Sequence, residues 1–236
     1  MKNSVTLLFA LLLTLSFTTN TKSQDKSDWK GGYPEGCTSI TVGKLASADG
    51  SVITSHTDDS HRTRSWMDIQ PAKDHKPGDM VPMYKRSADN TKAMPAYKHE
   101  KIGEIPQVEH TYQYLNSAYP SMNEKQLGIG ESTFGGREEL QSDAGLIDCQ
   151  RLCQLMVERC TTAREAIKMA GELVKEYGWN DYGEALTIAD PKEVWHFEIV
   201  GAGKGKVGAV WVAQRVPDDH ISCNVNASTI KEIDLS

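Results

Sequence analysis

Cys37 stands where a cysteine could act as a nucleophile. It follows Gly36 and precedes an alternation of apolar and polar residues that is typical of a strand. If the chain is cleaved between these two residues, Cys37 carries both a thiol and a free α-amine, whose ordinary pKa of about 8 lets it act as a base at neutral pH. The unhindered Gly36 carbonyl could itself be attacked by the thiol. Taken alone, however, Cys37 is better explained as a small side chain packed at the start of a strand.

Two other motifs could carry chemistry, and both have simpler explanations. His56, Asp58, Asp59 and His61 offer metal-ligand side chains within "SHTDDSH", but no HExxH or paired-cysteine spacing accompanies them. Clustered polar residues at a strand end are usually a solvated loop. Residues 203–208 match GxGxxG, yet a strand and not a helix follows, which indicates a hairpin turn.

The first residues resemble an export signal. Lys2 precedes an apolar run at 5–17, and small residues follow at 21–23. The run is short for a membrane span, which needs about 20 apolar residues. We therefore expect a signal peptide at 1–23, a segment at 24–36 that cleavage before Cys37 would remove as a propeptide, and one domain at 37–236. The mature protein is expected to be exported, either periplasmic or extracellular, without a membrane span.

Charge and cysteine content restrict the partners further. The formal net charge is −6 and no run of Lys or Arg occurs, so nucleic acid is not expected as a partner. Five cysteines in an oxidising compartment leave at least one without an intrachain partner. Cys149, Cys153 and Cys160 have helical spacing and are interpreted as buried small side chains, as is Cys223 in a later strand.

The hydrophobic pattern predicts a layered domain. Strands are expected at 38–44, 52–55, 108–114 and 127–133, helices at about 145–159 and 162–177, and further strands after residue 183. Residues 60–105 are polar and weakly periodic, which predicts long loops that frame a site. The order of the expected elements is strands, then two helices, then strands again. This order favours an α+β domain in which two antiparallel sheets stack and helices cover them.

Several segments resemble one family. The segment "GCTSITVGKLASADGSVITSHTDDS" is similar to the start of the mature dipeptidases of the N-terminal-nucleophile (Ntn) hydrolase superfamily, cysteine type. Later segments, "GIGESTFGGREEL", "IADPKEVWHFEIVG" and "VWVAQRVPDDHIS", resemble further blocks of that family in the same order. The resemblance extends from Cys37 to the C-terminus. It implies a four-layer αββα sandwich and hydrolysis of dipeptides or small amides without a metal or organic cofactor.

The resemblance also implies catalytic residues. Cys37 matches the nucleophile, and Asp59 matches the carboxylate that orients the nucleophile and its amine. Asn226 falls where related enzymes present an amide to the oxyanion, and Thr133 matches the other side of that hole through its backbone N–H. The thiolate would attack the dipeptide carbonyl, the α-amine would protonate the leaving amine, and water would hydrolyse the thioester.

Substrate-binding residues are less well defined by the motifs. His56 stands where the family has arginine, and an imidazole is shorter and not permanently charged. Arg62, Arg64 or Arg137 could hold a substrate carboxylate through two hydrogen bonds, although a solvated surface arginine is the more common case.

Three other functions stay open at this point. The first is a linear amide acylase of the penicillin V or conjugated bile acid hydrolase type, which has the same nucleophile and a different pocket. The second is a hydrolase that depends on a metal at His56 and His61. The third is an exported binding protein that keeps the fold without the chemistry, which the presence of Cys37, Asp59 and Asn226 argues against.

The chain stops soon after Asn226, whereas members of this family usually continue well beyond that point. We therefore expect the 236-residue chain, as a truncated or split form, to be a weak or inactive dipeptidase by itself. Missing strands would leave unpaired sheet edges and an uncovered apolar face, which favour association into a homo-oligomer.

Overall fold

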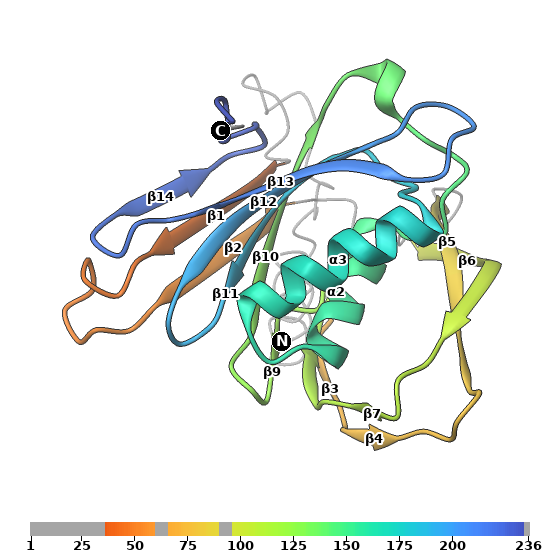
Figure 1. The fold of residues 1–236 in the computed structure, drawn as a ribbon, viewed down its shortest axis with the longest axis horizontal. Coiled ribbons are helices and arrows are strands. Elements are labelled where there is room, and N and C mark those ends of the chain that lie inside the picture. The colour runs from red at the N-terminus through yellow and green to blue at the C-terminus, as the bar shows by residue number, and fades with distance from the viewer. Residues whose placement is uncertain (1–35, 60–65, 90–95, 234–236) are drawn as a thin grey trace, which may run out of the picture. The chain divides into compact units, whose positions relative to one another are not determined.

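The structure is a computed structural model of the chain and describes residues 36–59, 66–89 and 96–233. Its strands and helices follow one another as Figure 1 shows. They are β1 (Gly36–Val42), β2 (Ile53–Asp59), β3 (Asp68–Gln70), β4 (Lys73–Asp74), β5 (Met80–Asp89), β6 (Ala96–Pro106), β7 (His110–Thr111), β8 (Tyr114–Asn116), β9 (Met122–Asn123), β10 (Gly128–Gly135), the 3-10 helix η2 (Glu138–Leu140), α2 (Cys149–Arg159), α3 (Ala163–Tyr177), β11 (Gly183–Ala189), β12 (Val194–Gly201), β13 (Ala209–Arg215) and β14 (Ile221–Asn224).

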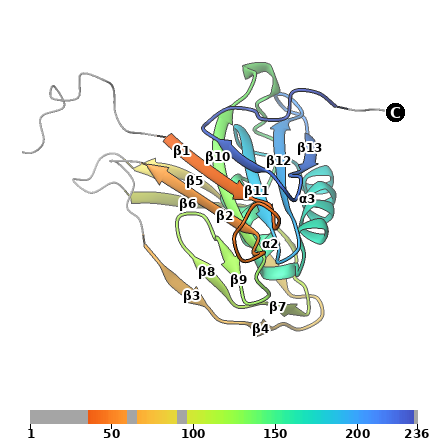
Figure 2. The same ribbon diagram turned by 90° about the vertical axis from the view of Figure 1, so that its left-hand side faces the viewer.

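Two antiparallel sheets stack on each other. One has three strands in the order β14-β1-β2, and the other has seven in the order β13-β12-β11-β10-β9-β8-β3. Figure 2 shows β1 and β2 crossing in front of β10 and β11, with which they are in contact. Gly130 of β10 permits this close approach, because a Cβ there would lie only 3.2 Å from the Cβ of His56.

Helices α2 and α3 pack on the seven-stranded sheet, where α2 contacts β10 and α3 contacts β11, β12 and β13. The core between them is fully buried and contains Met156, Trp179, Leu186 and Phe197. Stacked antiparallel sheets with covering helices confirm the predicted α+β architecture. In the described ranges both α-helices lie on this one sheet, so the second helical layer of an αββα sandwich stays a prediction.

Capping residues set the helix starts. The Thr162 side chain accepts a hydrogen bond from the Glu165 N–H at 3.3 Å, as the capping-box spacing predicted, and Gly178 ends α3 with a φ of 76°. Helix α2 begins later than expected, at Cys149, because the Asp148 side chain accepts from the Arg151 N–H at 2.8 Å and caps the helix there. Among the described residues, no helix is both long and apolar enough to cross a membrane.

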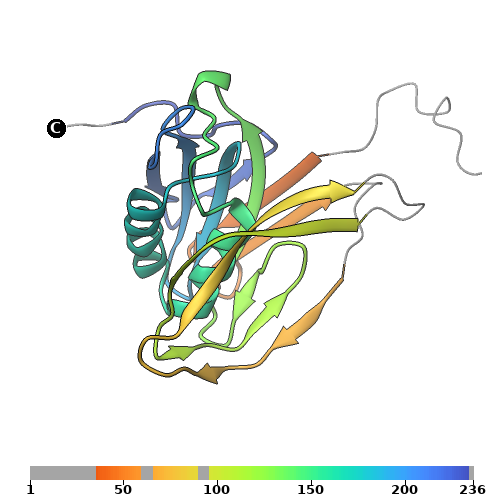
Figure 3. The same ribbon diagram turned by 90° about the vertical axis from the view of Figure 1, so that its right-hand side faces the viewer.

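Some expectations were wrong. The described parts of residues 60–105 are not mainly loops, because β5 and β6 form the long antiparallel hairpin seen in Figure 3. Met83 and Ile105 of this hairpin are fully buried, and the lysines between them obscured the alternation.

Cys223 is exposed on β14 and not buried, whereas the three helical-spacing cysteines are buried as predicted. The segment predicted as one strand at 108–114 is divided between β7 and β8, and residues 203–208 form the expected turn between β12 and β13.

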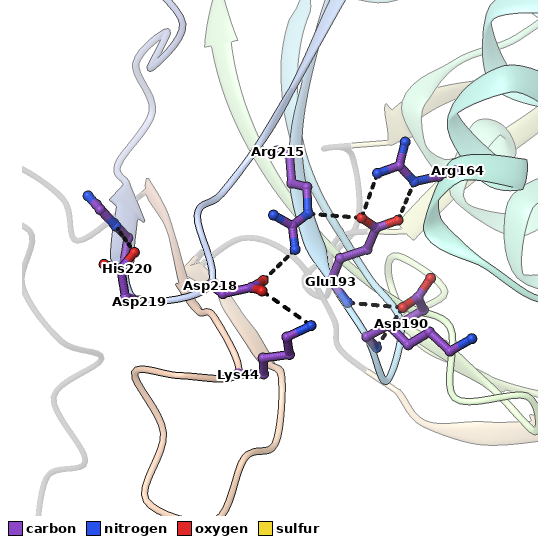
Figure 4. Close-up of polar contacts among 9 residues, drawn as sticks. Lys44, Arg164, Asp190, Glu193, Arg215, Asp218, Asp219 and His220 are labelled. Atoms are coloured by element: carbon purple, nitrogen blue, oxygen red, sulfur yellow. Dashed lines mark hydrogen bonds and ion pairs between the residues drawn. The ribbon is translucent and has the colours of Figure 1, made fainter.

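An ion cluster joins α3 to the strands near the β13–β14 turn (Figure 4). Glu193 accepts hydrogen bonds from Arg164 at 2.6 and 2.9 Å and from the Arg215 Nε at 2.9 Å. Arg215 also pairs with Asp218, whose other oxygen lies 3.2 Å from the Lys44 Nζ. We call these five residues the Glu193 cluster.

Candidate active site

Cys37 lies near the start of β1 with a half-buried side chain. Its backbone N–H donates a hydrogen bond to the Asn226 Oδ1 at 2.6 Å, although the two residues are 189 positions apart. Its Sγ lies 3.9 Å from the Glu131 Oε2, a long S–H···O contact. The predicted nucleophile is therefore positioned by β10 and by the segment after β14.

Asn226 connects the two sheets. Its backbone is left-handed with a φ of 51°, which asparagine tolerates better than most residues. Its N–H donates to the Ser132 Oγ at 2.9 Å, and its Nδ2 donates to the Thr133 carbonyl oxygen at 2.6 Å. A Cβ at position 36 would lie 3.0 Å from the Asn226 Oδ1, so Gly36 suits this close approach.

Cys37, Asn226 and Thr133 thus meet, as the sequence predicted. The Thr133 backbone also hydrogen-bonds to the Cys37 thiol, and this contact favours the thiolate. An oxyanion formed beside the sulfur would therefore develop close to the backbone N–H of Thr133 and the amide of Asn226. That these two groups bind the oxyanion stays a prediction.

The two neighbouring aspartates differ in their relation to the nucleophile. In the β1–β2 pairing Cys37 is opposite Asp58, whereas Asp59 is opposite Gly36. Asp59 is exposed and accepts a hydrogen bond from the Thr57 hydroxyl at 3.0 Å. Burial raises the pKa of Asp58, and the charges of His56 and Arg86 oppose that effect. The orienting role of Asp59 thus stays a prediction, and Asp58, which is opposite Cys37, is the competing candidate for that role.

The environment of Cys37 disfavours the thiolate. Burial raises the pKa of the Cys37 thiol to about 12, with further contributions from the charges of Glu131 and Asp58. Hydrogen bonds from the Thr133 backbone and the Asn226 side chain partly counteract this. In the uncleaved chain the thiol is therefore protonated at neutral pH and needs a base before it can attack.

A pair of buried glutamates lies beside Cys37 and was missed by the sequence reasoning. Glu131 of β10 and Glu184 of β11 are 1% and 2% exposed. One oxygen of each lies with the Cys149 Sγ in a group whose atoms are all within 4.8 Å of one another. The Thr133 Oγ1 lies 3.0 Å from the Glu131 Oε1 and 2.8 Å from the Glu184 Oε1. The available signal was a glutamate inside each of the two buried strands "GIGEST" and "GEALTIA".

The predicted substrate-binding residues are less closely tied to Cys37. His56 of β2 is half-buried opposite Ser39, and burial lowers its pKa, so it is neutral at neutral pH. Arg137 is exposed immediately before η2. His61, Arg62 and Arg64 lie outside the described residues.

A cavity in the described part of the chain is lined by several charged side chains. It has a volume of about 350 Å³ and is lined by the β5–β6 hairpin, the segment before α2 and the segment before β11. Its lining includes Arg86, Asp148 and Asp181. The charge of Arg86 acts on Asp58 and that of Asp181 acts on Glu131, so two residues of the cavity wall influence the carboxylates around Cys37.

Comparison with known proteins identifies the family. Residues 36–236 match the sequence profile of peptidase family C69. The chain belongs to this family. Over 220 residues it is 30% identical to a protein of Latilactobacillus sakei named "Probable dipeptidase", and the aligned region covers 85% of this chain and 41% of that protein. The resemblance to a dipeptidase family is confirmed.

Other C69 relatives give the same pattern. A "Probable dipeptidase A" of Streptococcus pyogenes serotype M1 is 26% identical over 215 residues, covering 85% of this chain and 41% of that protein. A "Dipeptidase" of Bifidobacterium longum is 26% identical over 217 residues, covering 84% and 38%. The chain therefore spans about two fifths of the length of these relatives.

Proposed function

We propose that this C69 chain takes part in dipeptide hydrolysis with Cys37 as an N-terminal nucleophile that is exposed by self-cleavage. The observation that carries the proposal is the hydrogen-bonded series from the Cys37 backbone N–H through the Asn226 side chain to the Thr133 carbonyl. Family membership and the names of the relatives support the substrate class. The signal-like sequence at 1–23 supports export, and the proposed chemistry needs no metal or organic cofactor.

The geometry suggests how the cleaved chain works. Once the bond between Gly36 and Cys37 is broken, the nitrogen that donates to the Asn226 Oδ1 becomes an α-amine held by the same acceptor. That amine can take the thiol proton, and its ammonium form lowers the thiol pKa through its charge. The sulfur attacks the peptide carbonyl, the oxyanion forms near Asn226 and Thr133, and the ammonium protonates the leaving amine.

The cavity lined in part by Arg86, Asp148 and Asp181 suits a small zwitterion. A dipeptide carries one ammonium and one carboxylate, and the cavity offers Asp148 and Asp181 for the first and Arg86 for the second. Its volume of about 350 Å³ fits a ligand of two residues. We propose that free dipeptides bind here in preference to amides with an uncharged acyl group.

The test uses the chain with Cys37 as its first residue. Release of free amino acids is measured for a panel of dipeptides and, separately, for penicillin V and conjugated bile acids. We expect dipeptide hydrolysis that disappears in Cys37→Ser and persists in Cys223→Ser, whose thiol is exposed on β14. Hydrolysis that does not depend on Cys37 would contradict the proposal, and cleavage of the acyl amides alone would favour the acylase.

A further inference from the structure

Self-cleavage needs a base that the uncleaved chain cannot obtain from its own Cys37. Before cleavage the Cys37 nitrogen belongs to a peptide bond, and its N–H is donated to the Asn226 Oδ1. An amide nitrogen cannot accept a proton at neutral pH, yet burial and nearby carboxylates keep the thiol protonated. If the nucleophile is exposed as proposed above, another group must first remove the thiol proton.

Glu131 is the side chain in contact with that thiol. Its Oε2 lies 3.9 Å from the Cys37 Sγ, and a contact of this kind often shortens when the reacting groups come together. Ser39, two residues beyond Cys37, donates its hydroxyl to the Glu131 carbonyl oxygen at 3.4 Å. Strand β1 is therefore held beside β10 at the level of Glu131.

Proton counting at Thr133 shows that the glutamate pair shares one proton. The Thr133 Oγ1 is within hydrogen-bonding distance of both Glu131 and Glu184, but a hydroxyl has a single proton to donate. If both glutamates were ionised, one of these two contacts would join two acceptors without a hydrogen. One of the two glutamates is therefore protonated, which the hydrogen bond between the Glu131 and Glu184 side chains also requires.

The proton belongs on Glu184. Its Oε2 is buried without a hydrogen-bond partner, and an unpaired oxygen costs much less on a neutral acid than on a carboxylate. Burial and the charge of Glu131 both raise the pKa of Glu184. Glu184 then donates to Thr133, Thr133 donates to Glu131, and the Glu131 carboxylate is left to face the Cys37 thiol.

We infer that Glu131 is the general base for self-cleavage between Gly36 and Cys37, and that Glu184 keeps it ionised by holding the shared proton. Glu131 takes the thiol proton while the sulfur bonds to the Gly36 carbonyl carbon. The C–N bond to Cys37 then breaks, and its nitrogen takes the proton back from Glu131. Water hydrolyses the resulting thioester, which gives the Gly36 carboxylate, a free thiol and a free α-amine.

Asp58 is the rival base, because it is opposite Cys37 on β2. It is less buried than Glu131, which is 1% exposed, and the described contacts place Glu131 and not Asp58 against the sulfur. After cleavage the α-amine replaces Glu131 as the base. The inference therefore separates the two reactions, since Glu131 is the base for self-cleavage and the α-amine is the base for turnover.

The test times cleavage of the full chain made by cell-free translation, using intact mass. Glu131→Gln keeps the size and hydrogen bonding of the side chain but cannot accept the proton, so we expect cleavage to slow by about 100-fold or more. The same variant produced with Cys37 as its first residue should lose much less of its dipeptide hydrolysis than the full chain loses of its cleavage rate, because the α-amine then supplies the base. Glu158→Gln is the matched control, because Glu158 is also buried but lies on α2.

A pH profile separates a base from a structural role. Cleavage by the unmodified chain should rise with pH as Glu131 ionises, with an inflection above the usual range of a glutamate because burial raises the pKa of Glu131. Glu131→Gln should lose that inflection. Among the described residues, the titratable groups that interact with Glu131 electrostatically or by a hydrogen bond include Cys37, Asp58, Tyr119, Cys149, Asp181 and Glu184.

Several results would overturn the inference. These are cleavage of Glu131→Gln at the unmodified rate, an unchanged pH inflection in that variant, an equal loss of cleavage and turnover, or loss of cleavage in Asp58→Asn alone. An unmodified chain that never cleaves also overturns it. Dipeptide hydrolysis by the chain that begins at Cys37 would even then leave the proposed function standing.

Discussion

Two groups of carboxylates in this protein occupy opposite environments. In the Glu193 cluster, burial of Glu193 is outweighed by hydrogen bonds from Arg164 and Arg215, so the pKa of Glu193 is lowered (Figure 4). Beside Cys37, Glu131 and Glu184 are buried next to each other and the pKa of each is raised. The cluster joins α3 to the strands through paired charges, whereas the glutamate pair stores a proton beside a thiol.

This difference separates stability from chemistry. An ion pair with a solvent-exposed partner such as Arg164 contributes modestly to folding, and its loss should not affect a reaction elsewhere. A buried pair of like charges costs folding free energy, and such sites are common where proton transfer occurs. Substitutions beside Cys37 should therefore reduce self-cleavage or dipeptide hydrolysis more than the free energy of unfolding. Substitutions in the Glu193 cluster should do the reverse.

The largest effect is expected for Cys37→Ala. Without a thiol, both dipeptide hydrolysis and self-cleavage should be abolished, while the thermal unfolding midpoint changes little. Cys153→Ala is the control, because Cys153 is fully buried in α2 and its truncation should cost about 1 kcal/mol of stability and spare activity. Amino acid release and thermal unfolding are measured for both. Residual cleavage at position 36 in Cys37→Ala would refute the role of the thiol.

A smaller loss is expected for Asn226→Ala. If the amide binds the oxyanion, kcat should fall on the order of 100-fold, because this contact strengthens only in the transition state. Asn224→Ala provides the comparison, since the Asn224 Nδ2 donates to the Ala227 carbonyl and the Thr229 hydroxyl and touches nothing at Cys37. Equal kcat losses in steady-state assays of the two variants would indicate a structural role for Asn226.

The two aspartates after Thr57 provide a third test. The family resemblance predicts that Asp59→Asn lowers kcat on the order of 10- to 100-fold through misplacement of the nucleophile, with little effect on stability. Asp58→Asn should be mild by the same prediction, although Asp58 is the residue opposite Cys37. Steady-state kinetics of both variants decide this. A reversed order would assign the orienting role to Asp58.

The smallest effects concern stability and should have opposite pH dependence in the two regions. Glu193→Gln should cost about 1 kcal/mol near neutral pH. Because the folded-state pKa of Glu193 is lowered, its contribution is present above the unfolded pKa and is lost as pH falls through the folded pKa, in the acidic range.

Glu184→Gln should behave in the opposite way. The folded-state pKa of Glu184 is raised, so ionisation destabilises the fold as pH rises above the unfolded value of about 4.3. The stability of this variant relative to the unmodified chain should therefore improve with rising pH. Chemical denaturation of both variants from about pH 4 to about pH 8 measures these trends. Parallel pH trends would remove the distinction between the two regions.

Much of the fold could be predicted because local patterns agree with the final contacts. Thr162 and Gly178 bound α3 as their residue types predict, and Asp49 and Gly50 lie in the loop of residues 43–52 that joins β1 to β2. The β5–β6 hairpin was missed because charged residues interrupt the alternation of apolar positions in its strands. Its buried positions, such as Met83 and Ile105, are recognisable only where they meet the core.

The site was predictable only where a motif marked it. Cys37 and Thr133 each fall in a segment that resembles the family, Asn226 lies four residues after another such segment, and the structure brings the three together. Glu131 lies in the same segment as Thr133, but neither it nor Glu184 was singled out, because a glutamate in a strand is ordinarily solvated. Their role depends on which strands become neighbours, and β10 and β11 pair so that Thr133 is opposite Glu184.

The central claim is that Cys37 becomes the first residue of the active protein. Intact mass and N-terminal sequencing of the purified protein, taken together with its dipeptide-hydrolysing activity, test this most directly. We predict that the active chain begins Cys-Thr-Ser-Ile, with residues 1–36 removed. An active preparation whose first residue is Gln24, with Cys37 still in an internal peptide bond, would contradict the account.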